Sequence, residues 1–323
     1  MPWARSGSGF TQLFDAFVIA LVREMPVKAV ADLLDVGDDR IWRVVTHYVE
    51  AARAEEDFGA VTAVGIDETA ARRGHAYITL VHDLEARRLL FACEGRDQGT
   101  VAKFVEDLEA HGGDAGSITA ACIDMSRSYI AGMGKHLTGA EITFDRFHVV
   151  KLANEALEEV RRAEVRTEPV LKRSRWMWLK DKHRWTKTQI AQHHDLSRRR
   201  LKTARAFRMK EELRDIFAQV GGRAEAAELL TAWLSWAKRC RLAPFRKLAR
   251  TLQAHWAGIL NGFDSGLTNG GVEAINGLIQ AAKARARGYR TTRNFINMAY
   301  LVAGQLKHLP VSPYDTTSGA VAN

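Results

Sequence analysis

The sequence predicts an α/β protein in which a mixed β-sheet is flanked by helices, with a helix-turn-helix before the sheet and a mostly helical insertion inside it. Three observations support this prediction. Residues 11–55 have helical apolar spacing, short strand-like runs begin at residue 61, and residues 164–260 are rich in helix formers. With 323 residues, of which 46% are hydrophobic and 26% charged, the chain has room for two or three folded units.

Residues 1–57 are expected to form a helix-turn-helix region. Helices are predicted at residues 11–25, 26–34 and 38–55, and Gly37 is expected to supply the tight turn before the third helix. Three side chains fall near one face of that helix and could reach base edges or phosphates in the major groove of DNA: Arg40, Arg43 and His47. A helical bundle that serves only packing or dimerisation would give the same pattern.

The sheet is expected within residues 58–163. Apolar runs of strand length alternate there with segments of helical spacing, and turn residues separate them. Strands are predicted at residues 61–67, 75–83, 88–93, 118–124 and 141–144, and helices at 99–111, at 126–137 and from residue 147. This order of three strands, then helix, strand, helix, strand and helix is that of a ribonuclease-H-like domain. In such a sheet the first and fourth strands lie side by side.

Three acidic residues stand where a divalent-metal site requires them. Asp67 and Asp124 are predicted at the ends of the first and fourth strands, and Glu273 begins a predicted helix just after residues 268–271. Carboxylates arranged in this way can converge on two cations about 3.5 to 4 Å apart, which clamp the attacking and leaving oxygens of a phosphodiester. A single aspartate at a strand end more often forms a turn or caps a helix, so the prediction depends on all three.

Magnesium is the expected cation, because it prefers oxygen ligands and retains water molecules, and manganese can substitute for it. Two other acidic residues are poorer candidates for its ligands. Glu68 is expected on the opposite face of the strand from Asp67, and Asp264 lies in a glycine-bearing linker, residues 262–271, with no helix to fix it.

Positive charge is concentrated in the middle of the chain. The net charge is +9, yet residues 161–250 hold 25 Lys and Arg against nine Asp and Glu, so the remainder is net negative. A polyanionic partner explains this asymmetry, because cationic side chains that neutralise phosphates release counterions, and a solvated helical surface is the alternative. Residues 164–262 are expected to form a helical basic insertion, since one loop cannot span the distance in sequence from Asp124 to Glu273.

The tryptophans of the insertion have two interpretations. Trp176, Trp178 and Trp185 alternate with Lys and Arg, as in a surface on which splayed bases stack. Packing in the insertion's own core is the favoured interpretation for the whole set, because Trp233 and Trp236 are spaced as on one face of a helix.

Residues 263–310 are expected to return to the sheet domain and to close it with the helix that carries Glu273. The stretch from residue 274 to 309 contains no acidic residue. Its cations could grip the DNA backbone beside a cut: Lys283, Arg285, Arg287, Arg290 and Arg293. A surface helix with unpaired charges is the alternative, and residues 311–323 are expected to be a tail.

The chain resembles the DDE transposases of bacterial insertion sequences, specifically their ISL-three branch. The resemblance extends from the N-terminal helices to about residue 309 and lies in ordered sequence blocks at residues 65–68, 123–129, 144–151 and 268–276, with a further match at 286–290. It implies that Asp67, Asp124 and Glu273 are the catalytic, metal-binding triad. It also implies that the protein cuts the DNA ends of its element and joins them to a target.

Partners and supporting residues also follow from the resemblance. It implies binding to double-stranded DNA, at transposon ends and at the target, and a homo-oligomer that brings two ends together. Asp145 and His148 are similar to a pair that supports the active site in several DDE families, for example by holding the scissile phosphate. The alternative is that Asp145 caps the helix that follows and His148 occupies its first turn.

Family members usually begin with a cysteine-rich zinc-binding module, and this sequence is expected to be N-terminally shortened because it has none. Its three cysteines, at positions 93, 122 and 240, form no Cys-x-x-Cys pair. No apolar run is long enough to span a membrane and no secretory signal is present, so a cytoplasmic, nucleoid-associated protein is expected. Two other functions fit the same residues: a structure-specific nuclease of this fold, and an inactive transposase-derived DNA-binding protein.

Overall fold

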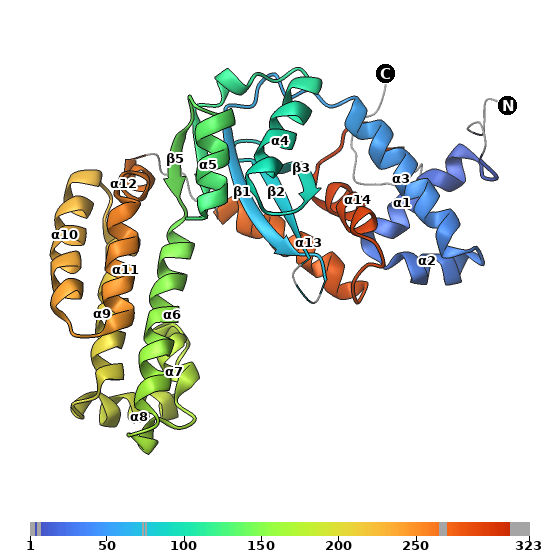
Figure 1. Ribbon diagram of the computed structural model, residues 1–323. Helices are drawn as coiled ribbons and strands as arrows, with labels where there is room; N and C mark the ends of the chain where they lie inside the picture. Colours follow the sequence, from blue (N-terminus) through green and yellow to red (C-terminus); the bar gives the residue numbers. More distant parts are fainter. Residues whose placement is uncertain (1–3, 5–7, 73, 75, 265–269, 311–323) are drawn as a thin grey trace. The chain divides into compact units, whose positions relative to one another are not determined.

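The computed structural model describes residues 4, 8–72, 74, 76–264 and 270–310. Parts of four predictions lie outside the described residues: residues 1–3 and 5–7 of the helix-turn-helix region, residue 75 of the second strand, residues 265–269 of the linker, and the tail. The chain divides into two compact units, coloured by sequence in Figure 1. Unit 1 consists of Met1–Ala121, Ser126–Ala140 and Asn269–Asn323, and unit 2 consists of Cys122–Met125 and Glu141–Thr268.

Three helices open unit 1, as the apolar spacing predicted. They are α1 (Gln12–Glu24), α2 (Val27–Leu34) and α3 (Asp38–Ala54). Thr11 caps α1, because its hydroxyl accepts a hydrogen bond from the Phe14 N–H at 3.1 Å. The prediction that Gly37 makes the turn before α3 is wrong. Asp35 makes it, with a left-handed φ of 52°, a conformation that a short polar side chain tolerates, whereas Gly37 has a φ of −63°.

Five strands form one mixed sheet. They are β1 (Ala63–Ala70), β2 (Tyr77–Asp83), β3 (Arg88–Glu94), β4 (Ala120–Ile123) and β5 (Glu141–Phe144). Their order is β3-β2-β1-β4-β5, and β1 to β3 form an antiparallel meander. The first and fourth strands are therefore neighbours, as predicted for a ribonuclease-H-like sheet.

Strand β1 extends further than its hydrophobicity indicated. Asp67 was expected at its end, but Asp67 pairs with Leu80 inside the strand, and pairing continues to Ala70 opposite Tyr77. The apolar run stops at Asp67 because the sheet surface becomes polar there, while backbone pairing with β2 carries the strand onward. The residues before and after Asp67 in β1 are thus both paired with β2, which fixes the backbone of Asp67 more firmly than a position at a strand end would.

Four further helices belong to unit 1. They are α4 (Gln98–Ala110), α5 (Arg127–His136), α13 (Gly270–Arg285) and α14 (Thr292–Ala303), and a short 3₁₀ helix spans Ala115–Ser117. Helices α4 and α5 pack closely against each other. Gly132 permits this approach, because a Cβ atom there would lie 2.7 Å from Cγ2 of Val101.

One hydrophobic core joins the beginning and the end of the chain. Buried side chains of α1, α2 and α3 pack with those of β2, β3, α13 and α14, and Val18, Ile41 and Phe295 are among its members. In Figure 1 α14 lies beside α3, and the Asn297 amide donates a hydrogen bond of 2.9 Å to the Thr46 hydroxyl between these helices. Helices α1 to α3 of the predicted region 1–57 and helices α13 and α14 of the predicted region 263–310 therefore pack as parts of one unit.

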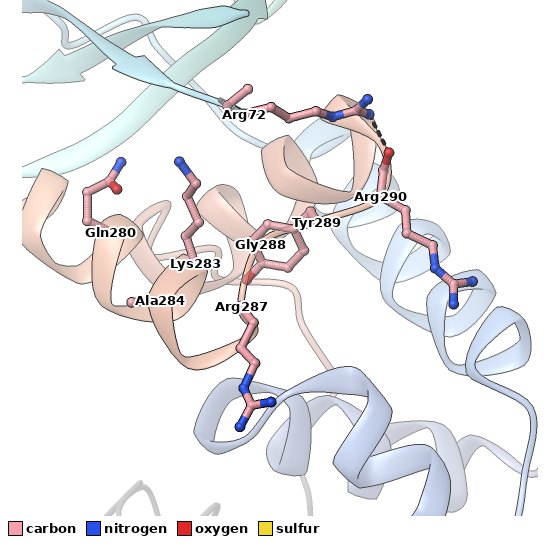
Figure 2. A pocket seen from close by; sticks show the side chains of 9 residues that line it. Arg72, Gln280, Lys283, Ala284, Arg287, Gly288, Tyr289 and Arg290 are labelled. Carbon is pink, nitrogen blue, oxygen red and sulfur yellow. Dashed lines mark hydrogen bonds between the residues drawn. The ribbon is translucent and has the colours of Figure 1, made fainter. Parts of the chain in front are cut away.

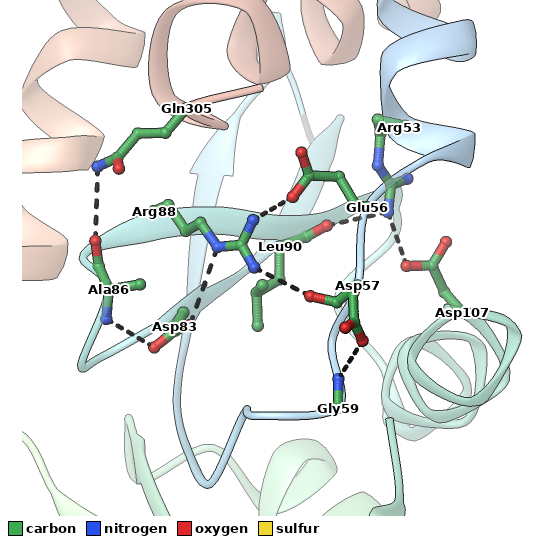
Figure 3. Close-up of polar contacts among 10 residues, drawn as sticks. All are labelled: Arg53, Glu56, Asp57, Gly59, Asp83, Ala86, Arg88, Leu90, Asp107 and Gln305. Atoms are coloured by element: carbon green, nitrogen blue, oxygen red, sulfur yellow. Dashed lines mark hydrogen bonds and ion pairs between the residues drawn. The ribbon is translucent and has the colours of Figure 1, made fainter. Parts of the chain in front are cut away.

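A polar network ties the end of α3 to the sheet (Figure 3). The Arg53 guanidinium donates to the Asp107 carboxylate at 2.7 Å and to the Leu90 carbonyl at 3.0 Å. Arg88, on β3, forms an ion pair with Glu56, whose side chain is nearly buried. These bonds fix the orientation of the N-terminal helices relative to the sheet within unit 1.

Unit 2 is helical apart from the β4–β5 region, in agreement with a mostly helical part of the fold, while the bounds 164–262 of the insertion stay a prediction. Its helices are α6 (Arg146–Glu164), α7 (Arg175–Leu179), α8 (Lys187–Arg198), α9 (Lys202–Gln219), α10 (Arg223–Arg239), α11 (Ala243–Ala254) and α12 (Trp256–Asp264), with short 3₁₀ helices at Pro169–Leu171 and Lys182–Arg184. Helix α6 packs on α9 and α11, and α10 packs on α9, α11 and α12. The predicted linker is wrong at its start, because α12 includes Asp264.

Tryptophans form much of the core of unit 2, as the packing interpretation held. Trp178 and Trp233 are buried, and their indole N–H groups donate to the Ser174 hydroxyl and the Met209 carbonyl at 3.0 and 2.8 Å. Trp176 differs from them, since it is 65% exposed. None of the described helices is long and apolar enough to cross a lipid bilayer.

Candidate active site

Helix α13 lies along strand β1, and hydrogen bonds join the two over successive helical turns. The donors are the side chains of Asn276, Gln280 and Lys283 on α13, and the acceptors are Asp67, Thr69 and Ala70 on β1. Residues three and four apart lie on one face of a helix, which explains why donors at this spacing meet one strand. These bonds fix one polar face of α13 at a defined position along β1.

The Asp67 carboxylate is bonded on both of its oxygens. Oδ2 accepts from the Asn276 amide at 2.5 Å, and Oδ1 accepts from the Glu68 backbone N–H at 2.8 Å. The side chain is half-buried. Hydrogen bonds to a carboxylate favour its charged form, so this environment suits an anionic metal ligand.

Glu273 is in the first turn of α13, three residues before Asn276, and its side chain is exposed. Side chains at this spacing on a helix have Cβ atoms about 5 to 6 Å apart. Because Asn276 bonds to Asp67, Glu273 extends from the turn of α13 adjacent to the one that touches the aspartate. A negative side chain is also favoured in the first turn by the helix dipole.

Asp124 directly follows β4, the strand next to β1 in the sheet, and its side chain is half-buried. It belongs to unit 2, whereas Asp67 and Glu273 belong to unit 1. Within the described residues, no three side chains of His, Cys, Asp or Glu gather closely enough to hold a metal ion. Asp67 and Glu273 are thus brought onto adjoining elements, and the participation of Asp124 stays a prediction.

Asp145 and His148 are at the start of α6 in unit 2. Asp145 is buried and caps the helix, because its Oδ1 accepts from the Phe147 N–H at 3.0 Å. Its Oδ2 lies 3.2 Å from Nδ1 of His148. The capping alternative thus describes the Asp145 geometry, and a supporting role for the pair in catalysis stays a prediction.

A cationic cavity of about 710 Å³ adjoins α13 beyond the end of β1 (Figure 2). Its charged lining residues are Arg72, Lys283, Arg287 and Arg290, and none of the described residues that line it is acidic. The Arg72 guanidinium donates to the Arg290 carbonyl, so the segment after β1 is tied to the segment after α13. An opening lined by four cations is suited to a polyanion.

The end of α13 shapes one side of this cavity. The Gly288 N–H donates back to the Lys283 carbonyl at 2.9 Å, and Arg287 and Gly288 have left-handed φ values of 55° and 96°. This reversal is a helix C-cap, and it turns the chain so that Arg287, Tyr289 and Arg290 line the same cavity as α13.

Arg285 is not among the residues that line the cavity. Its guanidinium donates to the backbone carbonyls of Glu24 and Arg23 at 2.6 and 2.9 Å, at the end of α1. It therefore caps carbonyls that have no partner within their helix. Its predicted contact with DNA remains untested, but the side chain already has a structural task.

The predicted DNA-facing side chains of α3 are exposed: Arg40, Arg43 and His47. Arg43 forms an ion pair with Asp39 at 2.5 Å, and the Arg40 guanidinium lies 4.3 Å from the centre of the Phe10 ring. Arg43 and His47 also line a hollow of about 590 Å³. The other side of this hollow is lined by Arg290 and by residues at the start of α14. This hollow contains acids as well as cations, so it is less suited to phosphate than the cavity beside α13.

Sequence reasoning missed three residues that the structure connects to the candidate site. Arg72 falls between two predicted strands, Asn276 falls in a matching sequence block, and His82 falls in a predicted strand, and none of them received a role of its own. Their sequence signal is weak, because each acquires its importance from a neighbour across the fold. His82 is buried in a sheet, which in sequence is indistinguishable from an ordinary strand residue.

Comparison with known proteins identifies the family. Residues 64–299 match the family model for the DDE transposase of the ISL3 type, described as a transposase, and residues 1–49 match that for the helix-turn-helix domain of transposase family ISL3. The chain belongs to the ISL3 family of transposases. The predicted α/β fold, the helix-turn-helix and transposase function are thereby confirmed, and ISL3 transposases are enzymes that cut and join DNA.

Two transposases of insertion sequences agree with the family match. The chain is 30% identical to the transposase for insertion sequence element IS1557 of Mycobacterium tuberculosis, over 96% of this chain and 76% of that protein. It is 28% identical to the transposase for insertion sequence element IS1001 of Bordetella parapertussis, over 85% and 69%. The Drosophila P element transposase strand transfer complex aligns over 94% of both chains with 12% identity and a TM-score of 0.46.

Proposed function

We propose that this ISL3 transposase binds two divalent cations, magnesium in the cell, through Asp67, Asp124 and Glu273, and cuts and joins the DNA of an insertion sequence there. The hydrogen bond from Asn276 to Asp67 carries the proposal, because it fixes α13, and Glu273 with it, along the strand of Asp67. Asp124 follows the strand next to β1 in the sheet order. All three residues offer carboxylate oxygens, the donors that magnesium prefers.

Divalent cations in such a site supply an activated water for the first cut and neutralise charge that builds up on the phosphate. The protein's own residues have separate tasks. Asn276 holds the Asp67 carboxylate, and the first turn of α13 presents Glu273. Lys283, Arg287 and the other cations of the cavity hold the DNA backbone beside the scissile bond, so that the 3′ hydroxyl released by cutting remains available for joining.

The DNA partner is double-stranded and is bound by two surfaces in this proposal. Exposed Arg40, Arg43 and His47 on α3 contact the transposon end, and the cationic cavity binds the backbone near the cut. Two copies of the chain hold two ends in a homo-oligomer, and binding to chromosomal DNA keeps the protein on the nucleoid. A gel-shift experiment with one and two labelled ends measures whether the complex pairs ends.

Metal-dependent cleavage of end-bearing DNA tests the triad. The wild-type chain is compared with Asp67→Asn, Asp124→Asn and Glu273→Gln in magnesium and in manganese. Each variant is expected to lose cutting and to retain DNA binding, because it removes a charge from the metal ligands but no cation from the DNA-binding surface. Glu68→Gln is the matched control, since Glu68 adjoins Asp67 in β1 and is directed to the opposite face. Full cutting by any triad variant excludes that residue.

Two further assays separate the alternatives. A nuclease of the same fold would release cut DNA without joining it, so a strand-transfer assay with a pre-cut end and a circular target distinguishes it from a transposase. An inactive DNA-binding protein would shift end-bearing DNA in a gel and leave it uncut in both metals.

A further inference from the structure

The Asn276 side-chain amide has a hydrogen-bond partner for its nitrogen but none for its oxygen among the described residues. Its amide nitrogen donates to Asp67 Oδ2. A carboxylate only accepts hydrogen bonds, so the amide must present nitrogen to Asp67 and oxygen to the opposite side. That oxygen, Oδ1, is buried and has no hydrogen-bond partner among the described residues. A buried acceptor without a donor costs about 1 to 3 kcal/mol, so a donor nearby is expected.

His82 is the group on that side. It is fully buried on β2 and pairs in register with Gly65, two residues before Asp67 on β1. Paired residues point to the same face of a sheet, as do residues two apart, so His82 and Asp67 share a face. Gly65 has no side chain, so the residue paired with His82 adds no side chain of its own to this face.

Both ring nitrogens of His82 are buried and lack a hydrogen-bond partner in the described part of the chain. Burial lowers the pKa of His82 to about 3, and the nearby Asn276 side chain acts in the opposite direction. The imidazole is therefore neutral at physiological pH and carries one N–H donor and one acceptor. The effect of Asn276 on the pKa of His82 shows that the two side chains are neighbours, and each has a buried hydrogen-bonding atom without a partner among the described residues.

We propose that His82 donates to Asn276 Oδ1 and so locks the amide that holds Asp67, which makes both side chains positioning residues for a metal-binding carboxylate. The inference rests on the proposed function, because it assigns Asp67 to the metal. The bond pairs two groups that otherwise lack a partner among the described residues, and the effect of Asn276 on the pKa of His82 shows that they are neighbours. Neither side chain contacts substrate, and both act through the orientation of Asp67.

This arrangement explains why a histidine with no charge occupies the centre of a sheet. Groups that orient a metal ligand typically change metal affinity by about 10- to 100-fold when they are removed. An Asn276 amide free to rotate would present its oxygen to the Asp67 carboxylate in part of the population, and two acceptors repel. When the His82 nitrogen nearest Asn276 carries the proton, that orientation sets the amide nitrogen against the histidine donor, so the N–H of His82 disfavours it.

Manganese binding to the full chain, measured by isothermal titration calorimetry without DNA, tests the proposal independently of catalysis. Asn276→Leu, which removes the amide at similar volume, is expected to weaken binding by about 10- to 100-fold. His82→Phe is expected to weaken it by a smaller factor, and His82→Gln, whose amide can still donate, to recover part of the loss. The double variant Asn276→Leu with His82→Phe is expected to bind no more weakly than Asn276→Leu alone, because His82 acts through Asn276.

Asn297→Leu is the matched control, because Asn297 is a buried asparagine of the same unit whose amide bonds to Thr46. It is expected to lower the melting temperature and to leave manganese affinity unchanged. Wild-type affinity in folded Asn276→Leu overturns the proposal, as do losses in the double variant that multiply. Asp67→Asn distinguishes failure of the proposed function from failure of this inference. If Asp67→Asn binds manganese with wild-type affinity, Asp67 is not a metal ligand and the proposed function fails. If Asp67→Asn loses affinity and Asn276→Leu does not, only the positioning role of Asn276 and His82 fails.

Discussion

Replacing either of two arginines near the end of α13 should affect a different property, DNA affinity for one and stability for the other. This contrast tests the proposed contact of the cationic cavity with DNA. Arg287 is exposed and lines the cationic cavity, whereas Arg285 donates to carbonyls at the end of α1. Arg287→Gln and Arg285→Gln remove the same charge two residues apart. Arg287→Gln also retains a side chain with a Cβ atom at a left-handed position, so backbone strain is unchanged.

The size of the effect follows from counterion release. Each phosphate that a cation neutralises contributes about −0.9 to the slope of log affinity against log salt. Loss of one contact in Arg287→Gln should therefore make the slope shallower by about 0.9. Between 50 and 200 mM salt, the ratio of wild-type to variant affinity should fall by about 3.5-fold. Arg285→Gln should keep the wild-type slope and reduce the free energy of unfolding by about 1 kcal/mol, because exposed carbonyls lose their donor.

Fluorescence anisotropy of a labelled duplex across this salt range measures the slope, and urea denaturation measures stability. A wild-type slope in Arg287→Gln would refute the assignment of the cavity to phosphate. An equal loss of slope in Arg285→Gln with unchanged stability would show that the capping bonds seen at α1 do not occupy that side chain.

Three further predictions concern unit 1. Tyr300→Phe removes the hydroxyl that accepts a 2.7 Å hydrogen bond from the buried Ala92 N–H, so urea denaturation should show a loss of about 1 to 3 kcal/mol. Gly132→Ala places a Cβ atom against Val101 and should cost about 1 to 3 kcal/mol, a loss that a second change, Val101→Ala, should reduce. Burial raises the pKa of the Cys93 thiol to about 11, so the thiol is protonated at pH 8. At that pH it should react with iodoacetamide far more slowly than free cysteine does. Reaction at the rate of free cysteine contradicts this prediction.

Much of the fold could be predicted from the sequence because its elements have strong local signals. The helices α1 to α3 have regular apolar spacing, and β1 to β3 are apolar runs separated by turn residues. Boundaries were less accurate where tertiary pairing decides them. Strand β1 continues past Asp67 because β2 pairs with it, and α12 continues through Asp264, neither of which the hydrophobic pattern reveals.

The candidate site was only partly predictable for the same reason. Asp67, Asp124 and Glu273 were found from the resemblance and from their positions beside apolar runs. Asn276, Arg72 and the buried His82 were not, because their roles arise from contacts across the fold, such as the bond from α13 to β1. Arg285 shows the converse, since its charge suggested DNA while its geometry shows a helix cap.

The shared core of the first three helices and the last two also affects how the protein is made. Helices α1 to α3 emerge from the ribosome before the sheet and unit 2, but their partner α14, which ends at Ala303, is synthesised only after both. Contacts between such distant segments form late, because the intervening chain must be closed into a loop. Unit 2, which lies almost wholly between them in sequence, can fold earlier. In a nascent chain, α1 to α3 therefore stay without their partner α14, and α13 cannot pack along β1, until residues 270–303 have been synthesised.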